Sequence, residues 1–553
     1  MNEKIKNIVF IAVFLGGCTS PAHKEKSDHF QTKSISNIWV ADNGDGTYTN
    51  PILHTDYSDP DVIRVENDFY MTASSFNCSP ALPILHSKDL VNWQIVNYAL
   101  KRQQPTEFFD KPQHGKGVWA PCIRFHQGEF YIYWGDPDYG VYMIKSTDPF
   151  GQWSNPVLVM PGKGIIDPSP LWDEDGYVYL ITAWAASRSG INSVLTVWPM
   201  NEAGTQVIGE GKHVYDGHDH NQTIEGPKLY KKDGYYYIFA PAGGVTQGWQ
   251  LVLRSKNIYG PYEEKVVLSQ GSTSINGPHQ GAWVETQTGE SWFIHFQDKG
   301  AYGRILHLQP INWRKGWPVM GIDNDGDGCG EPVATYKKPN VGKKWPFCTP
   351  DESDEFTNGH LGLQWQWAAN FNIKWSVQLK GKDYLRLLAY PKTEVGHRLW
   401  DTPNLLLQKF SAPSFTATTK VKFTIEWDSW QGKQAGMIVS GSDYSFLAIS
   451  KDEKGYLLNQ IVCKEANLGG EEKIVASVRL KSSEVYMQVK VAEPDALCNF
   501  FYSEDGENYN PIGIEYVAKP ELWIGSKVGL FCTAEPNIRK GGYADFDWFR
   551  VNK

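Results

Sequence analysis

The stretch Asp59-Pro-Asp-Val-Ile63 opens a unit of sequence that recurs four more times before residue 335. A turn follows it at Asn67-Asp68, and an aromatic residue, Phe69, begins the next apolar run. The other units open at Ala120-Pro-Cys-Ile-Arg124, Asp167-Pro-Ser-Pro-Leu171, Glu225-Gly-Pro-Lys-Leu229 and His279-Gln-Gly-Ala-Trp283. Repetition of strand, turn and strand at intervals of about 50 to 60 residues is typical of β-propellers, in which each unit forms one blade. The pattern predicts a five-bladed β-propeller.

The first residues of the five units are expected to meet around one axis, and three of them are the carboxylates Asp59, Asp167 and Glu225. Two opposed carboxyl groups can hydrolyse a glycosidic bond, because one activates water while the other protonates the leaving oxygen. A third carboxylate nearby raises the pKa of the acid. An Asp before Pro also commonly begins a turn, so the prediction depends on the joint pattern of three acids.

Beyond the repeats the strand pattern changes. Residues 415–423 and 485–491 alternate apolar and polar side chains, which is typical of a β-sandwich with one wet face per sheet. The stretch before them, 336–351, is rich in Pro, Lys and Gly and predicts a linker. We therefore expect an all-β chain: a five-bladed β-propeller over residues 36–335, followed by a β-sandwich domain over residues 352–553.

The N-terminus has the features of an export signal. Lys4 and Lys6 precede an apolar segment, 8–15, that is too short to span a bilayer. The closing Leu15-Gly-Gly-Cys18 resembles a bacterial lipobox. We predict a signal peptide over 1–17, lipidation of Cys18, and a flexible tether over 18–35. The protein is then an exported lipoprotein held by its lipid anchor alone, with the periplasmic side of the outer membrane favoured and the cell surface as the alternative.

Charge and cysteine content exclude several classes of partner. The net charge of −9 at pH 7 and the absence of Lys/Arg clusters argue against nucleic acid. The 22 Trp, 28 Tyr and 25 Phe residues mostly fill β cores, and a few of them are available to stack on sugars. No Cys-x-x-Cys spacing exists, so a structural zinc site is not expected. The seven cysteines after Cys18 are expected to be mostly buried thiols, with one or two disulfides left open.

One acidic loop suggests a calcium site without completing it. Asp323-Asn-Asp-Gly-Asp-Gly328 begins like an EF-hand loop, whose spacing then requires Glu at position 334. The chain has Ala334 there, and Glu331 is out of register. We expect a polar loop; a structural calcium ion is left open and is not predicted.

Several motifs resemble glycoside hydrolase family 43: Asn50-Pro-Ile-Leu53, Tyr57-Ser-Asp-Pro-Asp-Val-Ile-Arg64, Gly164-Ile-Ile-Asp-Pro-Ser169 and Thr223-Ile-Glu-Gly-Pro-Lys-Leu-Tyr230. Leu361-Gly-Leu-Gln-Trp-Gln-Trp367 is similar to the concanavalin-like sandwich of the β-xylosidase and arabinofuranosidase branches. The resemblance implies a propeller enzyme that inverts anomeric configuration and requires no cofactor.

Carried over by motif position, the resemblance implies that Asp59 is the general base and Glu225 the general acid. Asp167 would tune and orient the acid. Asp61 competes with Asp59 as the base because it lies two residues on. Inversion predicts a separation of about 6.5 to 9.5 Å between base and acid carboxyls, which leaves room for a water molecule.

Three further residues are candidate substrate contacts. Trp119 opens the second unit and either walls the sugar site or fills the core. His279 holds the fifth axial position, and its alternative is a hydrogen-bonded core histidine. Arg304 resembles an arginine that contacts sugar hydroxyls in the family, and an exposed ion pair is its alternative. His218 and His220 either line the pocket or lie in a solvated loop.

The favoured function is an exo-acting, inverting glycosidase that releases terminal non-reducing α-L-arabinofuranosyl residues from plant hemicellulose, such as arabinoxylan or xyloglucan side chains. A β-D-xylosidase, or a bifunctional enzyme, is the alternative, because no residue separates the two sugars. A non-catalytic glycan-binding lipoprotein is the rival from another class, and it would be expected to lose a carboxylate. The expected partner is an oligosaccharide or polysaccharide; the oligomeric state is left open.

Overall fold

The structure, a computed structural model, describes residues 35–393, 397–426, 429–537 and 541–553. The predicted signal peptide 1–17, Cys18 and residues 19–34 of the predicted tether lie outside the described residues. In the described ranges the helices are single turns: α1 (Thr106–Phe109), α2 (Ala186–Ser189), α3 (Gly244–Gln247), η1 (Gly300–Tyr302), η2 (Thr357–Gly359), η3 (Leu399–Asp401) and η4 (Ala466–Leu468). None of them is long and apolar enough to cross a bilayer.

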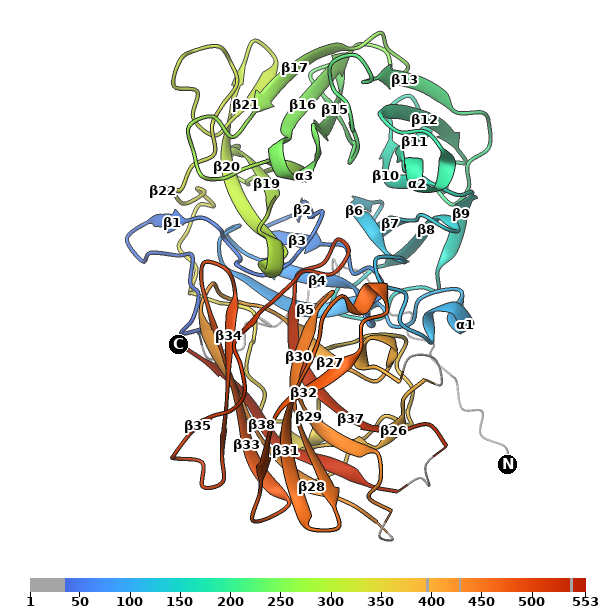
Figure 1. Cartoon of the computed structure of the whole chain (residues 1–553). Coiled ribbons are helices and arrows are strands. Elements are labelled where there is room, and N and C mark those ends of the chain that lie inside the picture. The colour runs from blue at the N-terminus through green and yellow to red at the C-terminus, as the bar shows by residue number, and fades with distance from the viewer. Residues whose placement is uncertain (1–34, 394–396, 427–428, 538–540) are drawn as a thin grey trace, which may run out of the picture. The chain divides into compact units, whose positions relative to one another are not determined.

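Five four-stranded antiparallel sheets form the propeller, and Figure 1 shows them arranged in a ring. The first two blades are β2 (Asp61–Val65), β3 (Asp68–Thr72), β4 (Ala81–Ser87) and β5 (Trp93–Leu100), then β6 (Trp119–His126), β7 (Glu129–Asp136), β8 (Gly140–Ser146) and β9 (Val157–Pro161). The third is β10 (Ile165–Trp172), β11 (Val178–Trp184), β12 (Val194–Met200) and β13 (Lys212–Asp216). The last two are β14 (Lys228–Lys232), β15 (Tyr235–Ala242), β16 (Trp249–Ser255) and β17 (Glu263–Leu268), then β18 (His279–Glu285), β19 (Ser291–Asp298), β20 (Arg304–Arg314) and β21 (Trp317–Met320).

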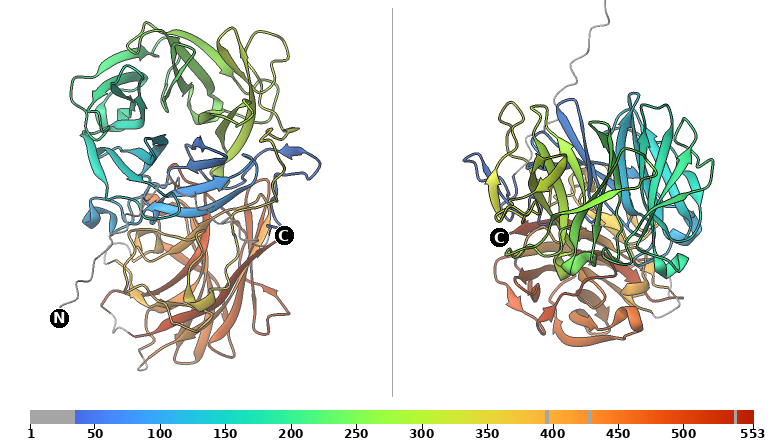
Figure 2. Two further views of the ribbon diagram at one scale, coloured as in Figure 1. Left: turned by 180° about the vertical axis from the view of Figure 1, so that it is seen from behind. Right: turned by 90° about the horizontal axis from the view of Figure 1, so that it is seen from above.

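The second strand of each blade explains why the aromatic runs recur. β7 and β15 are buried along nearly their whole length, because each blade packs between two neighbours. Such strands read as continuous apolar or aromatic runs rather than as an alternation. The sequence Tyr235-Tyr-Tyr-Ile-Phe-Ala240 therefore predicts a central blade strand, and the structure confirms it. The same ring of sheets is visible from behind in Figure 2.

The N-terminal segment joins the last blade and closes the ring. The backbone N–H of Leu306 in β20 donates to the Leu53 carbonyl at 3.0 Å. β1 (Thr47–Thr49) pairs with β22 (Thr335–Lys337), the strand that follows the last blade. These contacts cover strand edges that would otherwise present unpaired backbone groups.

The C-terminal domain is a β-sandwich of two antiparallel-rich sheets, as expected. One sheet contains β23 (Gln366–Trp367), β26 (Tyr390–Pro391), β27 (Leu406–Lys409), β29 (Lys433–Ser440), β30 (Tyr444–Asp452), β31 (Gly455–Cys463), β32 (Glu472–Arg479) and β37 (Lys527–Ala534). The other contains β24 (Ser376–Val377), β25 (Leu385–Leu388), β28 (Phe415–Thr424), β33 (Glu484–Ala492), β34 (Leu497–Ser503), β35 (Asn510–Pro511), β36 (Tyr516–Val517) and β38 (Tyr543–Asn552). Along β33 buried and less buried side chains alternate, which confirms the predicted wet face.

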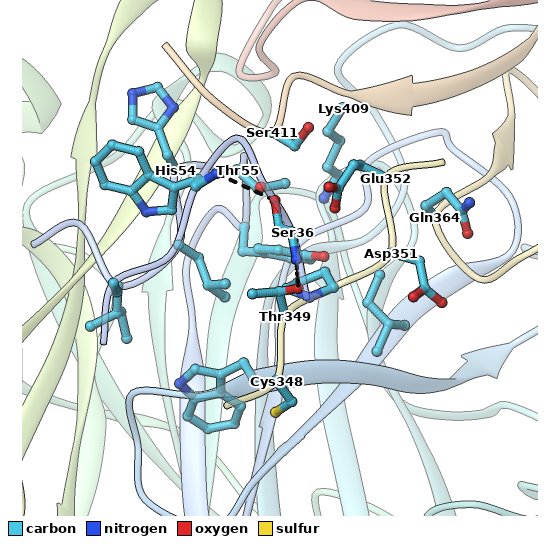
Figure 3. Close-up of a pocket in the computed structure, with 18 of the residues that line it drawn as sticks. Ser36, His54, Thr55, Cys348, Thr349, Asp351, Glu352, Gln364, Lys409 and Ser411 are labelled. Atoms are coloured by element: carbon cyan, nitrogen blue, oxygen red, sulfur yellow. Dashed lines mark hydrogen bonds between the residues drawn. The ribbon is translucent and has the colours of Figure 1, made fainter. Parts of the chain in front are cut away.

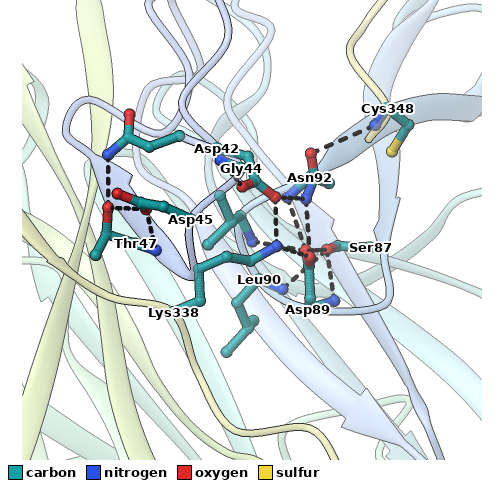
Figure 4. Close-up of polar contacts among 12 residues, drawn as sticks. Asp42, Gly44, Asp45, Thr47, Ser87, Asp89, Leu90, Asn92, Lys338 and Cys348 are labelled. Carbon is teal, nitrogen blue, oxygen red and sulfur yellow. Dashed lines mark hydrogen bonds and ion pairs between the residues drawn. The ribbon is translucent and has the colours of Figure 1, made fainter. Parts of the chain in front are cut away.

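The segment predicted as a linker, 336–351, is fixed to the propeller at its start. Residues 336 and 337 belong to β22, and the Lys338 ammonium lies between the carboxylates of Asp42 and Asp89 (Figure 4). The Lys338–Asp89 distance is 2.7 Å, and the side chains of Asp42 and Asp89 are only 6% and 2% exposed. A buried carboxylate left without its cation is costly. The ion pairs therefore hold this part of the segment in place.

Further along, the chain passes a pocket between the segment 36–57, β5, residues 348–352 and β27. Figure 3 shows Ser36 and Thr349 in this pocket, where the Ser36 backbone N–H donates to Thr349 Oγ1 at 2.9 Å. Lys409 from β27 also lines it. This pocket marks where propeller and sandwich residues face each other.

All seven described cysteines are free thiols, and five of them are buried: Cys78, Cys122, Cys463, Cys498 and Cys532. The expectation of mostly buried thiols is confirmed for these residues.

Candidate active site

The start of each inner strand carries a left-handed residue. Asp59 and Asp167 have φ of 56°, and Gln280 has φ of 30°. The corresponding residues of the second and fourth blades are Ala120 and Gly226, with φ of 36° and 59°. The pairing register shifts beside three of these residues, as in a β-bulge. A bulge re-aims a side chain, so two consecutive residues of one strand can face the same side.

This geometry refines the alignment of the repeats. In the fourth blade the left-handed residue is Gly226, so Glu225 lies one position earlier than Asp59 and Asp167 do in their own blades. His279 likewise precedes the left-handed Gln280, and Trp119 precedes Ala120. The expectation that Glu225 and His279 occupy the same blade position as the two aspartates is therefore off by one residue. Both side chains nevertheless reach the axis.

A cavity of about 450 Å³ opens at this axis. It is lined by Asp59, Phe76, Trp119, Ala120, Ile166, Asp167, Glu225, Val245, His279, Gln280, Arg304 and Trp523. All six residues predicted from the sequence as catalytic or substrate-binding are brought together here.

Asp59 is held as an acceptor of three hydrogen bonds. Its Oδ2 accepts from the hydroxyls of Ser58 at 2.8 Å and Ser74 at 2.6 Å. Its Oδ1 accepts from Arg304 Nη1 at 3.2 Å. These donors fix the orientation of both Asp59 oxygens, so the side chain is placed as a proton acceptor at the axis.

Asp167 is also buried, with 2% of its surface exposed, and its Oδ2 accepts two hydrogen bonds. They come from the backbone N–H of Gly226 at 2.7 Å and from Gln280 Nε2 at 3.2 Å. Burial raises the pKa of Asp167, the charge of Asp59 adds to the rise, and the Gly226 hydrogen bond opposes it. The donated hydrogen bonds favour the carboxylate form at Oδ2.

Glu225 is in the opposite situation. Burial raises the pKa of Glu225, and the charge of Asp167 raises it further. One-third of the Glu225 side chain remains exposed, so a bound sugar can reach it. His279 Nε2 lies 3.6 Å from Glu225 Oε1, and burial followed by the Arg304 charge lowers the pKa of His279 to about 3. A neutral histidine does not favour ionisation of Glu225, which is therefore arranged to keep its proton.

Asp61, the competing base, does not line the cavity. It is fully buried, and its Oδ2 accepts from Arg124 Nη1 at 2.8 Å and from the Ile123 backbone N–H at 2.6 Å. These partners belong to the second blade. Asp61 therefore joins two blades, which leaves Asp59 as the carboxylate that faces the axis.

Trp523 is one of the pocket residues that sequence reasoning missed, together with Phe76, Ile166, Val245 and Gln280. It lies in the sandwich, 42% exposed, on the turn before β37. Its ring meets Trp119 edge-on at 6.1 Å, and the Arg304 guanidinium lies 5.6 Å from its centroid. No local pattern near residue 523 predicts this position. Gln280 was within reach of sequence reasoning, because it directly follows the predicted His279.

Two other predicted groups lie elsewhere. His218 and His220 are exposed and are not among the residues lining the cavity, and His218 Nδ1 lies 2.5 Å from Asp216. The carboxylates of Asp323, Asp325 and Asp327 lie within 4.8 Å of one another on the loop after β21, outside the cavity lining. The structure therefore gives neither group a place in the pocket.

The pocket thus combines a carboxylate beside an arginine with a carboxyl group that keeps its proton. This is the pair that acid–base cleavage of a glycosidic bond requires. The third carboxylate, Asp167, lies against the backbone of Gly226, next to Glu225.

Comparison with known proteins agrees with this chemistry. The family model "Glycosyl hydrolases family 43" matches residues 48–318, and "Beta xylosidase C-terminal Concanavalin A-like domain" matches residues 353–552. The chain is 40% identical to a putative β-xylosidase of Xylanibacter ruminicola, over 89% of this chain and 87% of that protein. It is 28% identical to a non-reducing end α-L-arabinofuranosidase of Bacteroides ovatus, over 91% and 94%.

Among solved structures, a xylan β-1,4-xylosidase of Bacillus halodurans matches with a TM-score of 0.80 at 26% identity, covering 91% of this chain and all of that one. Fold, site and relatives agree. The chain belongs to glycoside hydrolase family 43.

Proposed function

We propose that this glycoside hydrolase releases single pentosyl residues from the non-reducing ends of plant hemicellulose with inversion of configuration. The observation that carries the proposal is the contrast between Asp59 and Glu225 in one small cavity: the former is hydrogen-bonded as a carboxylate, and burial and charge raise the pKa of the latter. The reaction uses only water and these carboxyl groups.

In the proposed mechanism Asp59 accepts a proton from a water molecule, whose oxygen attacks the anomeric carbon. Glu225 gives its proton to the glycosidic oxygen as the bond from that oxygen to the anomeric carbon breaks. At the end of the step Asp59 is protonated and Glu225 is ionised, and exchange with solvent restores both. Asp167 keeps the pKa of Glu225 raised before the step.

The pocket shape supports attack at a chain end. Trp119 and Trp523 stand edge to face at its rim, and Trp523 comes from a different domain. In this proposal the two aromatic rings close one side of the pocket, so that it takes a terminal sugar ring. His279, Gln280 and Arg304 offer polar atoms to its hydroxyls. The sandwich in this proposal supports the rim and does not act as a separate glycan-binding module.

Two sugars are candidates for the released residue. The name of the 40% identical relative, a putative β-xylosidase, supports β-D-xylosyl, and so does that of the matching solved structure. The arabinofuranosyl residue favoured by the sequence reading is supported by the 28% identical Bacteroides relative. We propose β-D-xylosyl as the first candidate for the released sugar and α-L-arabinofuranosyl as the second. A bifunctional enzyme would release both.

One assay tests the proposal. The purified protein is given nitrophenyl β-D-xyloside and nitrophenyl α-L-arabinofuranoside, and the product anomer is followed by NMR. We expect turnover of at least one substrate, with the inverted anomer appearing first. Absence of turnover on both nitrophenyl substrates and on xylo- and arabino-oligosaccharides would favour the non-catalytic glycan-binding lipoprotein instead. Glu225→Gln is the matched control, because it keeps the shape of the acid and removes its proton.

We also propose that the protein is exported and lipidated at Cys18, on the strength of Leu15-Gly-Gly-Cys18. Expression with a labelled fatty acid should mark the wild-type chain and leave Cys18→Ser unmarked. Equal labelling of both chains would contradict this proposal. Whether protease added to intact cells degrades the protein distinguishes the cell surface from the periplasm.

A further inference from the structure

A single buried carboxylate, Asp56, links the sandwich to the arginine beside Asp59. We propose that Asp56 is a positioning residue that fixes the Asp59–Arg304 pair and the Trp523 wall at the same time. The inference rests on the proposed function, in which Asp59 is the base. It assigns to Asp56 a role in the reaction although its side chain does not line the pocket.

Each oxygen of the Asp56 carboxylate accepts one backbone hydrogen bond. Oδ1 accepts from the N–H of Arg304 in the propeller at 3.0 Å. Oδ2 accepts from the N–H of Gly525 in the sandwich at 2.8 Å. Asp56 itself is 3% exposed. One side chain therefore fixes two backbone segments that lie far apart in the sequence.

The backbones around Asp56 approach so closely that side chains would not fit. A Cβ on Gly303 would lie 2.4 Å from Asp56 Cγ, and Gly303 has φ of 74°. A Cβ on Gly525 would lie 2.6 Å from the backbone nitrogen of Gly303. The Ser526 N–H also donates to the Ala301 carbonyl at 2.7 Å. The junction has no free volume in which either segment could shift independently.

On the propeller side the junction leads to the base. The Arg304 guanidinium donates from Nη1 to Ser58 Oγ at 2.6 Å and to Asp59 Oδ1 at 3.2 Å. Its guanidinium carbon also lies 4.7 Å from the Phe296 ring centroid. Asp56 fixes the Arg304 backbone, and the guanidinium in turn holds Asp59. A displaced Arg304 would lose its contact with Asp59 Oδ1 and leave the carboxylate free to turn away from the axis.

On the sandwich side the junction holds the turn that carries Trp523. Gly525 lies two residues after Trp523, whose backbone has φ of 69°. Leu522, the residue before Trp523, packs against Gly115. A Cβ added to Gly115 would lie 2.7 Å from Leu522 Cδ2. Glu521 binds His114 Nδ1 at 2.9 Å. The turn is thus anchored at both ends, and Asp56 holds the end nearer the base.

The chemistry of the side chain makes the inference testable. A carboxylate offers two acceptor oxygens, whereas asparagine offers one oxygen and one NH₂ group. In Asp56→Asn the amide oxygen can accept from only one of the two backbone N–H groups. The other, of Arg304 or of Gly525, then faces the NH₂ group, which is itself a donor. The substitution keeps the volume of the side chain and removes one of the two anchors.

The experiment compares Asp56→Asn with wild type and with Gln366→Met. Gln366 Nε2 donates to the Pro80 carbonyl at 2.8 Å, another buried contact between sandwich and propeller. We expect Asp56→Asn to lower kcat/KM by about 10- to 100-fold, the effect of slight misplacement of catalytic groups. Gln366→Met should leave kcat/KM unchanged.

A second readout does not need activity. Acrylamide quenching of tryptophan fluorescence is measured for each protein and for the same protein with Trp523→Phe. The difference reports the accessibility of Trp523, and it should increase in Asp56→Asn. Gly525→Ala, which retains Asp56 and displaces the turn, should show the same increase, and it replaces Asp56→Asn if that variant does not fold. Wild-type quenching together with a wild-type kcat/KM overturns the inference, as does an equal effect of Gln366→Met. If the wild-type protein is inactive on every glycoside, the proposed function is refuted. The role of Asp56 at the junction is still tested, because the quenching measurement does not depend on activity.

Discussion

The propeller and the sandwich are both built of antiparallel sheets, but the propeller gathers buried charged side chains around a central cavity. The propeller places Asp59, Asp167 and Arg304 at its axis, each less than a tenth exposed. The main core of the sandwich is formed by apolar residues such as Leu387, Met487 and Phe546. A sandwich closes its sheets on each other, whereas a ring of blades leaves a central space where polar side chains can meet.

The exception in the sandwich explains how the two domains cooperate. Its contribution to the pocket is Trp523, carried on a turn and not on a strand. A turn can reach out from a sheet without disturbing the core beneath it. Chemistry therefore belongs to the propeller axis, and the sandwich adds to the shape of the pocket.

The largest expected effect separates two aspartates of the propeller. Asp59→Asn removes the proposed base, so we expect kcat to fall about 10²- to 10⁴-fold while the melting temperature stays close to that of wild type. Asp61→Asn breaks the buried pair with Arg124, so we expect a loss of about 3–5 kcal/mol in the free energy of unfolding with activity retained in the folded protein. Kinetics and denaturant unfolding check the two variants. The reverse pattern would make Asp61 the base.

The next effect concerns Asp167, whose charge contributes to the raised pKa of Glu225. In Asp167→Asn that charge is gone, so the pKa of Glu225 falls. Because the acid works only while protonated, the alkaline limb of kcat should move to lower pH. A pH–rate profile of both proteins measures the shift. A limb that stays in place or moves to higher pH would show that Asp167 does not tune the acid.

A smaller effect is expected from the sandwich turn. Trp523→Ala opens the rim of the pocket, and we expect KM for a nitrophenyl glycoside to rise about tenfold, or ~1.4 kcal/mol, with kcat less affected. Product analysis on xylo-oligosaccharides serves as a second measurement. If KM and the products match those of wild type, the sandwich does not shape the pocket.

In the core of the sandwich the effect should be on stability alone. Met487 in β33 is fully buried, so Met487→Ala should lower the free energy of unfolding by about 2–5 kcal/mol. At 25 °C, well below the transition, kcat/KM should remain that of wild type. A loss of kcat/KM in the folded variant would show that the core of the sandwich, and not only its turn, supports the pocket.

The smallest expected effect is that of reduction. The seven described cysteines are free, so dithiothreitol should leave the melting temperature unchanged. A drop on reduction would reveal a disulfide within the described residues and contradict the structure.

Local sequence alone determined the two architectures and six of the twelve residues that line the pocket. The recurring turns and aromatic runs predict the blades, since a strand buried on both faces must be apolar along its length. The alternation in residues 485–491 predicts the sandwich in the same way. Asp59, Asp167 and Glu225 were found because a repeat brings equivalent positions to one axis.

Only the tertiary structure decided the rest. The offset that places Glu225 one residue before the left-handed Gly226 is a backbone conformation that the repeat in the sequence does not show. The choice between Asp59 and Asp61 depends on Arg124, which lies in another blade. Trp523 and the Asp56 junction depend on contacts between segments hundreds of residues apart, for which no local pattern exists. Periodicity is a property of neighbours in the chain, whereas the packing of two domains is a property of the folded surfaces alone.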